Sequence, residues 1–510
     1  MEEISQMIPF FSNLVIFFLC TILLILLMRW WASRPWLCTC KICTAYLTSS
    51  WSEDFDNIVD WYTHLLRESP TRTIHIHVLR NTITANSDNV EHMLKTKFDN
   101  YPKGKPFSSI LGDLLGRGIF NADGHSWSFQ RKMASLELGS LSVRSYAYQI
   151  VSHEVRHRLL PLLDSVSGDG KLLDLQDVFR RFSFDTICKI SFGLDPGCLE
   201  LTLPISEFAK AFDMASRLSA KRATSVSPWV WKLKRILNIG SEKELKRAIG
   251  MVNELAREVI KQRRKLGFSG NQDLLSRFMG SIDDDAYLSD IVVSFLLAGR
   301  DTVSSGITSF FFLLSKYPEV EAAIIAEIRA NMVGEDSHRG EDLEREAVPA
   351  VLTYNHLRQL QYVHAALYEC MRLHPPVQFD SKFALEDDVL PDGTFVKKGT
   401  RVTYHQYAMG RMEHTWGETS NEFDPKRWLD DNGKFAPANP YKFPVFQGGQ
   451  RVCLGKEMAL MEMKSVVVSI VKQFKIDVFA NSDYHQSPKF ISGLTASLHG
   501  GLPAKIRKRN

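Results

Sequence analysis

A single cysteine near the C-terminus lies in the segment of this chain with the clearest chemical potential. Residues 446–455 read Phe-Gln-Gly-Gly-Gln-Arg-Val-Cys-Leu-Gly, so Cys453 follows a glycine-rich turn. An apolar-periodic run from Glu457 to Phe474 predicts a helix just after it. The positive end of that helix would favour the thiolate over the thiol. A thiolate on a tight loop, surrounded by free amide groups, is suited to the axial position of a haem iron.

A second group with chemical potential lies in the apolar stretch from Asp290 to Lys316, whose centre reads Ala298-Gly299-Arg300-Asp301-Thr302. Gly299 lowers helix stability by about 1 kcal/mol relative to alanine and would allow close approach of a planar ligand. The Thr302 hydroxyl can bond to a carbonyl one turn back and open a kink. With Asp301 beside it, the pair could pass protons inward through water. A simple packing notch between helices is the alternative.

Two further patterns place polar residues one helical turn apart. Glu369 and Arg372 share one face of a largely apolar helix, and the segment 423–428 downstream supplies another arginine. Trp127 and Arg131 have similar spacing. Each pattern alone is also typical of an ordinary amphipathic surface helix.

Composition excludes several classes of protein. The chain has 510 residues, 45% of them hydrophobic, which is ample for a large core and predicts about three domains by length alone. Its 62 basic and 58 acidic residues give a net charge of only +4, so nothing indicates nucleic-acid binding. The 8 cysteines are too sparse for a disulfide framework and favour a reducing compartment.

The N-terminal segment has the composition of a membrane span. Ile8 to Met28 contains no charged residue, which meets the roughly 20 residues needed to cross a bilayer. Acidic residues precede this stretch, and Arg29, Arg34 and Lys41 follow it, so the rest of the chain is expected in the cytosol. A cleaved signal peptide is the alternative, but the stretch is long and lacks a basic start and a small-residue cleavage site.

Three cysteines follow this segment closely, at Cys38, Cys40 and Cys43. The spacing suggests zinc, but no partner pair or histidine lies close enough in the sequence to complete four ligands. Acylation is a further alternative. Ordinary linker cysteines are the favoured interpretation, and His75 and His77 are expected to form a solvent-facing pair on a strand.

The remaining chain shows mainly helical periodicity with a small β portion. Thr73 to Ala85 alternates like a strand, and Asp387 to Tyr404 indicates a hairpin with its turn at 391–393. The polar segments 267–272 and 334–346 are expected to be surface loops.

Together these motifs resemble one family. The cysteine loop matches the pattern Phe-x-x-Gly-x-Arg-x-Cys-x-Gly of the haem-binding loop of the cytochrome P450 monooxygenases, and the other patterns occur in the family's order. The resemblance covers essentially the whole chain, although the proline-rich hinge common after the anchor is reduced to Pro35. It implies a mainly α fold with a small β portion, and a single catalytic domain instead of several: an anchor over 1–30, a linker over 31–60 and a haem-thiolate monooxygenase domain over 61–510.

The resemblance also implies cofactors, partners and residue roles. It implies haem b, O₂ as co-substrate, and electrons from NADPH through NADPH-cytochrome P450 reductase at the endoplasmic reticulum membrane. Asp301 and Thr302 would organise protons, and Glu369, Arg372 and a second arginine would fix the core. The residues expected at the haem are Trp127, Arg131, Ala298, Gly299, Phe446, Arg451, Cys453 as the iron ligand, and Gly455.

Longer strings narrow the resemblance. Residues 375–382, 387–393 and 407–412 are similar to the plant fatty-acid ω-hydroxylases. Residues 45–51, 111–120 and 134–140 are more similar to the branch that oxidises jasmonoyl-isoleucine, from its 12-hydroxy to its 12-carboxy form. This implies an amphipathic carboxylate substrate in a narrow apolar channel with walls at 105–120, 295–298, 377–379 and 491–494. The candidate donors to its carboxylate are Lys105, Arg117, Lys221 and Arg222, although an ordinary surface charge is the favoured interpretation of each.

Alternative functions remain open at this point. Fatty-acid ω-hydroxylation is the main competing activity. A haem-thiolate isomerase or dehydratase, or a haem protein that is not an enzyme, would need no reductase. Asp301 and Thr302 argue against the isomerase class, since such enzymes can dispense with the threonine hydroxyl.

Overall fold

The computed structural model describes residues 21–22, 38–168, 170–200, 207–225, 227–267, 273–336, 352–479, 488–491 and 493–509. The predicted anchor over 1–30 lies outside these ranges except for two residues, and the loops expected at 267–272 and 334–346 lie mostly outside them. Among the described residues, none of the helices has the length and apolar character needed to cross a bilayer.

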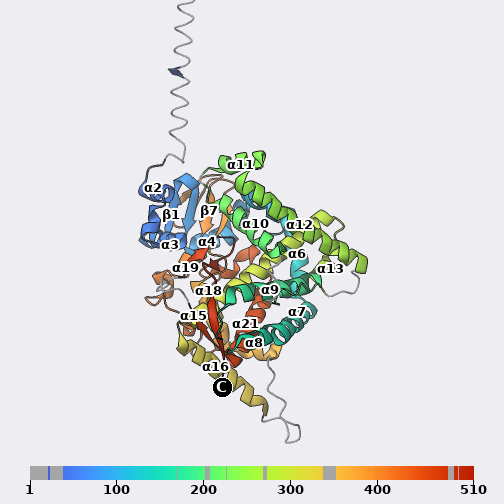
Figure 1. The fold of residues 1–510 in the computed structure, drawn as a ribbon. Coiled ribbons are helices and arrows are strands. Elements are labelled where there is room, and N and C mark those ends of the chain that lie inside the picture. Colours follow the sequence, from blue (N-terminus) through green and yellow to red (C-terminus); the bar gives the residue numbers. More distant parts are fainter. Residues whose placement is uncertain are drawn as a thin grey trace, which may run out of the picture.

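Helices make up most of the described chain, as the sequence predicts (Figure 1). Their bounds are α2 Lys41–Thr48, α3 Ile58–Glu68, α4 Ser87–Glu91, α5 Gly104–Leu115, α6 Gly124–Gly139, α7 Leu141–Glu154, α8 Leu160–Val166, α9 Leu175–Phe192, α10 Glu207–Ala223, α11 Pro228–Leu237, α12 Gly240–Leu266, α13 Leu274–Met279, α14 Asp285–Leu296, α15 Thr302–Leu314, α16 Pro318–Asp336, α17 Tyr354–Gln359, α18 Gln361–Leu373, α19 Gln406–Met409, α20 Glu413–Trp416 and α21 Lys456–Gln473.

The strands form small sheets at the side of the helical body. Their bounds are β1 Thr73–Ile76, β2 Asn81–Thr84, β3 Leu173–Asp174, β4 Asp380–Phe383, β5 Asp388–Val389, β6 Phe395–Val396, β7 Arg401–Tyr404, β8 Phe474–Val478, β9 Phe490–Ile491, β10 Ser497–Leu498 and β11 Pro503–Lys508. The largest sheet has the order β1-β2-β7-β4, with β2 parallel to β7 and the other pairs antiparallel. The remaining sheets have the orders β3-β11-β8, β10-β9 and β5-β6.

Two of the sequence expectations change in detail. The strand predicted over 73–85 is a hairpin, because a short helical turn at His77–Leu79 and a left-handed Arg80 (φ 48°) separate β1 from β2. The wall expected as a loop at 105–120 is mostly the helix α5, which buries Leu111, Leu114 and Leu115. The predicted β5–β6 hairpin is confirmed.

One helix forms the axis of the core. Every residue of α15 from Val303 to Leu314 is buried, as is typical of a helix that is apolar on all sides. The helices α9, α18 and α21 pack around it. This arrangement brings the start of α15 and the start of α21 to the same interior cavity, although their sequences lie far apart.

A buried ionic network connects α18 to the chain after α20. Glu369 and Arg372 have fully buried side chains, with Arg372 Nε 2.7 Å from Glu369 Oε2. Arg427 Nε lies 3.3 Å from Glu369 Oε1, and the Trp428 indole N–H donates to Glu369 Oε2 at 2.8 Å. The predicted Glu-Arg-Arg triad is therefore present as a structural group.

Candidate functional site

The Cys453 loop is built by close backbone packing. Gly449 has φ 59°, and a Cβ there would collide with the carbonyl oxygen of Leu94. The neighbouring Gly448 is confined in a similar way by Tyr441. The Cys453 N–H donates to the carbonyl of Phe446 at 2.8 Å, which closes the turn just before α21. The glycines are thus required because the loop packs directly against other parts of the chain.

The side chain of Cys453 is exposed to the cavity that it lines. Burial raises its pKa, while the Gly455 N–H and the cations of Arg131 and Lys456 act in the opposite direction. A bound metal cation would add a stronger attraction, because a coordinated thiol loses its proton outright. Burial is the larger effect, so the neutral thiol is favoured until a metal cation binds, and the thiolate expected from the sequence would depend on that cation.

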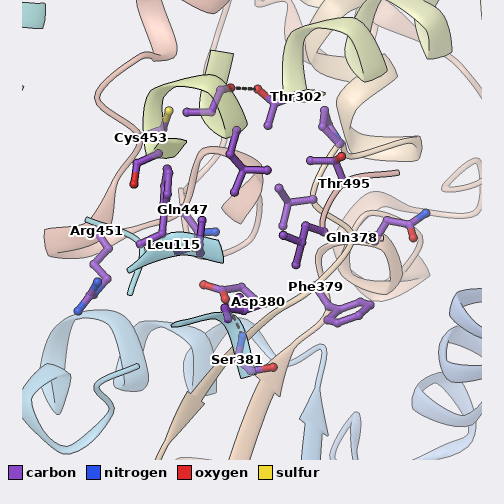
Figure 2. A pocket seen from close by; sticks show the side chains of 18 of the residues that line it. Leu115, Thr302, Gln378, Phe379, Asp380, Ser381, Gln447, Arg451, Cys453 and Thr495 are labelled. Atoms are coloured by element: carbon purple, nitrogen blue, oxygen red, sulfur yellow. Dashed lines mark hydrogen bonds between the residues drawn. The ribbon is translucent and has the colours of Figure 1, made fainter. Parts of the chain in front are cut away.

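The cavity has a volume of about 680 Å³, and Figure 2 shows Cys453 and Thr302 near one end of it. Most of the predicted catalytic and cofactor-binding residues line it, although they come from α6, the segment around the start of α15, and the loop before α21. The predicted residues that line the cavity are Trp127, Arg131, Ala298, Gly299, Thr302, Phe446, Arg451, Cys453 and Gly455. The exception is Asp301, which is not among the described lining residues.

The helix around Thr302 is widened. Residues Leu297–Asp301 form a π-helical turn between α14 and α15. The Thr302 hydroxyl donates to the carbonyl oxygen of Ala298 at 2.6 Å, as predicted from the sequence. A π turn inside an α-helix frequently marks a functional site, because it changes the direction of side chains and loosens the hydrogen-bond ladder. Thr302 thus presents its oxygen to the cavity where the helix is distorted.

Gly299 has a different role from the expected one. A Cβ at this position would collide with the side chain of Ile187 from α9, so the missing side chain makes room for a neighbouring helix. The expectation that Gly299 leaves space for a planar ligand is wrong in this respect, although its backbone does line the cavity. The packing notch considered for this segment is therefore real and lies on the α9 side.

Asp301 takes part in a charge pair instead of facing the cavity. Arg300 Nη1 lies 3.1 Å from Asp301 Oδ1 and 2.6 Å from Asp213 Oδ1 on α10. Burial raises the pKa of Asp301, and the Arg300 cation opposes that shift. Asp213 is 42% exposed, so the chain of charges connects solvent with the start of α15. The expected role of Asp301 in proton delivery therefore stays a prediction.

The cationic end of the cavity fits a dicarboxylate. Arg131 makes no ion pair with any described residue, and its pKa is lowered by burial. Arg451 pairs with Asp123 at 2.6 Å, but its buried Nε has no hydrogen-bond partner among the described residues. The Arg451 guanidinium lies 4.6 Å from the Trp127 ring. Unsatisfied donors of this kind suit the two propionates of a porphyrin, and Cys453 would supply the iron ligand, so the residues present fit haem.

A buried cluster that sequence reasoning missed lies beside this end of the cavity. The carboxylate of Asp380 on β4 forms ion pairs with Lys103 Nζ at 2.5 Å and Lys382 Nζ at 3.4 Å. It also accepts a hydrogen bond from the Tyr404 hydroxyl at 2.9 Å. The two lysines hold the pKa of Asp380 far below its usual range, although burial acts against them. Figure 2 shows Asp380 opposite the end marked by Cys453 and Thr302. No spacing in the sequence signals the cluster, because α5 and the largest sheet bring its members together.

The substrate walls are mostly confirmed as lining. Phe107, Phe120, Phe295, Phe379 and Leu494 all contact the cavity. Of the expected carboxylate donors, only Lys221 lines the described cavity.

The other expected donors are engaged or lie elsewhere. Arg117 pairs with Asp284 at 2.7 Å, and Arg222 is buried against Glu242 and Asp113. Lys105 is exposed outside the lining. Four cations that were not expected, Lys103, Arg217, Lys382 and Arg401, do line the cavity.

Comparison with known proteins agrees with this geometry. The family model described as Cytochrome P450 matches residues 50–498. The chain is 61% identical over 477 residues to Cytochrome P450 94C1 of Arabidopsis thaliana, covering 93% of this chain and 94% of that protein. It is 47% identical over 474 residues to Cytochrome P450 94B3 of the same plant, covering 90% of each. It is 43% identical over 474 residues to Cytochrome P450 94A1 of Vicia sativa, covering 90% of this chain and 88% of that protein.

A solved structure shows the same fold at low sequence identity. The crystal structure of the cytochrome P450DA heme domain superposes with a TM-score of 0.69 at 22% identity, covering 84% of this chain and 88% of that one. The helical body with its small sheets is therefore the cytochrome P450 fold. The sulfur loop, the distorted helix, the cationic end of the cavity and these similarities agree, and the chain belongs to the cytochrome P450 family as a haem-dependent monooxygenase.

Proposed function

We propose that this enzyme oxidises the terminal carbon of the jasmonoyl-isoleucine side chain, from the 12-hydroxy to the 12-carboxy form. The observation that carries the proposal is the lining of the cavity. Apolar side chains form the walls that lead to Cys453, and cations lie on the lining away from the Cys453 loop. The strings at 45–51, 111–120 and 134–140, shared with the jasmonate-oxidising branch, support the same substrate. The 61% identity to Cytochrome P450 94C1 is a further support for the proposal.

The apolar walls would determine which carbon reacts. Haem, when bound to Cys453, supplies the activation of O₂ with electrons that come from NADPH through the reductase. Phe107, Phe120, Phe295 and Leu494 restrict the cavity, so that an extended substrate can present only its tip to the sulfur side. Because a terminal methyl is intrinsically less reactive than an internal methylene, this positioning must select the site of attack. The alcohol product stays at the same place and can be oxidised again.

Thr302 is proposed to hold the water that delivers protons. Its hydroxyl hydrogen is engaged by the Ala298 carbonyl, so the lone pairs of its oxygen can accept a hydrogen bond from water in the cavity. Asp301 would resupply the proton through water, and the Arg300 cation would hold its carboxylate in place.

Cations on two elements are proposed to bind the substrate carboxylate. Arg217 and Lys221 lie one turn apart on α10, and both line the cavity with exposed side chains. Arg401 on β7 donates to the carbonyl of Ala223, two residues after Lys221, at 2.8 Å. Arg401 also lines the cavity, and no described carboxylate forms an ion pair with it. A carboxylate at this point would leave the apolar part of the substrate directed inward.

Turnover with defined substrates tests the activity. Full-length enzyme, reductase and NADPH are incubated separately with 12-hydroxyjasmonoyl-isoleucine, jasmonoyl-isoleucine and lauric acid, and the products are identified by mass spectrometry. The proposal expects the 12-carboxy conjugate. If both conjugates are recovered unchanged while lauric acid is consumed, the jasmonate proposal fails and fatty-acid ω-hydroxylation stands.

Variants test the carboxylate site separately. Arg401→Gln and Lys221→Gln should each raise KM about tenfold, since a hydrogen bond to a charged group contributes about 1.5–3 kcal/mol. Lys105→Gln is the matched control, because Lys105 is an exposed lysine outside the cavity lining. Equal KM values for all three variants would show that the carboxylate binds elsewhere.

The enzyme is further proposed to act at the endoplasmic reticulum membrane, anchored by residues 8–28 with the catalytic domain in the cytosol. The helix α11 supports this, since it exposes Trp229 by 70% and Ile236 by 80% to solvent. Figure 1 shows α11 and α2 at the same end of the molecule, and the Tyr46 hydroxyl of α2 donates to the carbonyl of Thr224 at 2.8 Å. An apolar helix face beside the anchor would lie in the lipid interface. Extraction at alkaline pH and protease protection of microsomes test this orientation.

A further inference from the structure

Two linker cysteines and a histidine that lies far from them in the sequence come together next to α2. Cys38 and Cys40 lie just before α2, and His77 begins the helical turn after β1. The two sulfurs and an imidazole nitrogen all lie within 4.8 Å of one another. The expectation that these cysteines have no histidine partner is therefore wrong, because the turn after β1 places His77 beside the linker.

A third thiol completes the group. Cys43, in the first turn of α2, is 0% exposed and contacts the thiols of both Cys38 and Cys40. The Cys43 N–H donates to Cys40 Sγ at 3.4 Å, and the Val78 N–H donates to Cys43 Sγ. Backbone N–H groups directed at sulfur stabilise negative charge, as they do at other thiolate sites. Burial and the two neighbouring thiols nevertheless raise the pKa of Cys43 to about 11, so its deprotonation would require a bound metal cation.

We propose that Cys38, Cys40, Cys43 and His77 bind a structural zinc ion. Three thiolates and one imidazole are a standard tetrahedral zinc set, with Zn–S near 2.3 Å and Zn–N near 2.0 Å. The ligand atoms of Cys38, Cys40 and His77 already lie within 4.8 Å of one another, and Cys43 would complete the set after a side-chain rotation. Soft sulfur ligands exclude Mg²⁺ and Ca²⁺, which prefer oxygen.

The neighbourhood of the ligands favours this use over the alternatives. Acylation needs an accessible thiol, which the fully buried Cys43 does not offer, although the exposed Cys40 does. A disulfide between two of the three sulfurs would leave the third thiol beside His77 without a bonding partner. The ring of His75 stacks on that of His77 at 5.9 Å, and Thr82 Oγ1 lies 3.0 Å from His75 Nδ1, so the exposed His77 ring is supported from β1 and β2.

The zinc ion would fasten the linker to the catalytic domain. Residues 38–43 would be joined to the end of β1, in the largest sheet, immediately after the segment expected to cross the membrane. Figure 1 shows α2 beside β1 at this corner of the molecule. Because metal binding is coupled to the ordering of its ligands, the ion would fix the direction in which the linker leaves the domain.

Metal analysis of the haem-loaded, full-length enzyme tests the site. Enzyme produced with added Zn²⁺ should contain about one zinc per chain, and X-ray absorption at the zinc edge should show about three sulfur neighbours and one nitrogen neighbour. Haem iron does not contribute at this edge. Cys40→Ser and, independently, His77→Gln should lower the retained zinc about tenfold or more, while Cys198→Ser, a partly buried cysteine elsewhere, should retain it.

Several outcomes would overturn the proposal. These are wild-type enzyme without zinc, a first shell without sulfur, equal zinc in Cys40→Ser and wild type, or a disulfide between any two of the three cysteines in non-reducing peptide mapping. A second measurement tests whether the ion holds the linker to the catalytic domain. Trypsin should cleave after Lys41 several-fold faster when a chelator removes the ion, because loss of the metal frees its ligands. An unchanged cleavage rate would contradict it. Monooxygenase turnover is not part of this test, so its outcome is independent of the proposed substrate.

Discussion

Removal of the Glu369 carboxylate should destabilise the fold more than the loss of any exposed ion pair. This carboxylate accepts hydrogen bonds from Arg372 Nε and Nη2, both at 2.7 Å, from Arg427 Nε at 3.3 Å and from the Trp428 indole at 2.8 Å. The backbone N–H of Asp424 adds another at 3.1 Å. Glu369→Ala removes all of these acceptors at once.

The magnitude follows from the burial of the partner. Arg372 is 0% exposed, so the substitution leaves its cation without a counter-charge in the interior. Breaking a buried pair in this way costs about 3–5 kcal/mol, a large share of the stability of a typical domain. Arg372 keeps its bonds to the carbonyls of Gly410, Ser420 and Glu422, which places the expected loss toward the lower end. Glu369→Gln, which keeps the volume and one acceptor oxygen, should lose less.

Urea unfolding of the haem-loaded enzyme, followed by tryptophan fluorescence, measures the effect. The control is Glu91→Ala, which removes an exposed i,i+4 partner of Lys95 at 2.7 Å and should leave the midpoint nearly unchanged. Equal midpoints for Glu369→Ala and Glu91→Ala would refute the reasoning, since they would mean that the buried network contributes no more than a surface pair.

The remaining predictions concern pH and the cavity. Burial raises the pKa of Glu462 to about 8 from its ordinary 4.5, so the folded state holds a proton that the unfolded state has lost between these values. The free energy of unfolding of the wild type should therefore fall by about 1.4 kcal/mol for each unit by which the pH rises in this window. The urea midpoints of Glu462→Gln should lack this pH dependence, and an identical slope of midpoint against pH in the two proteins would contradict the prediction. Gly449→Ala should reduce the haem-thiolate signal in the carbon monoxide difference spectrum because its Cβ meets Leu94, whereas Gly433→Ala, with φ 71° but open space, should retain it. Thr302→Val should consume NADPH with several-fold less product, as expected when a proton-transfer group is lost; Thr308→Val, which removes a similar bond to Ser304 at 2.7 Å, is its control, and unchanged coupling in both would exclude this role for Thr302.

Several parts of the site could be predicted because they depend on local sequence. The Cys453 turn, the bond from Thr302 to Ala298 and the pairing of Glu369 with Arg372 all involve residues within a few positions of one another. Backbone geometry fixes such contacts once the helix or turn forms. The mainly helical class follows in the same way, because hydrophobic periodicity is a local property.

Other parts depend on packing and could not be predicted. The role of Gly299 was misjudged because the Ile187 side chain that fills its space comes from another helix. Asp301 faces Arg300 and Asp213, since α10 approaches from outside the cavity.

The sequence by itself identified the family and predicted the sulfur ligand and the proton-handling role of Thr302, because each depends on a short pattern whose chemistry is independent of the rest of the chain. Only the tertiary structure decided which charges are free to face the cavity and which are already paired, as Arg401 and Arg222 show. It alone brought His77 to Cys38 and Cys40. The physical reason is that a charge or a ligand acts through its distance to a partner, and for residues distant in sequence the packing of helices and sheets sets that distance.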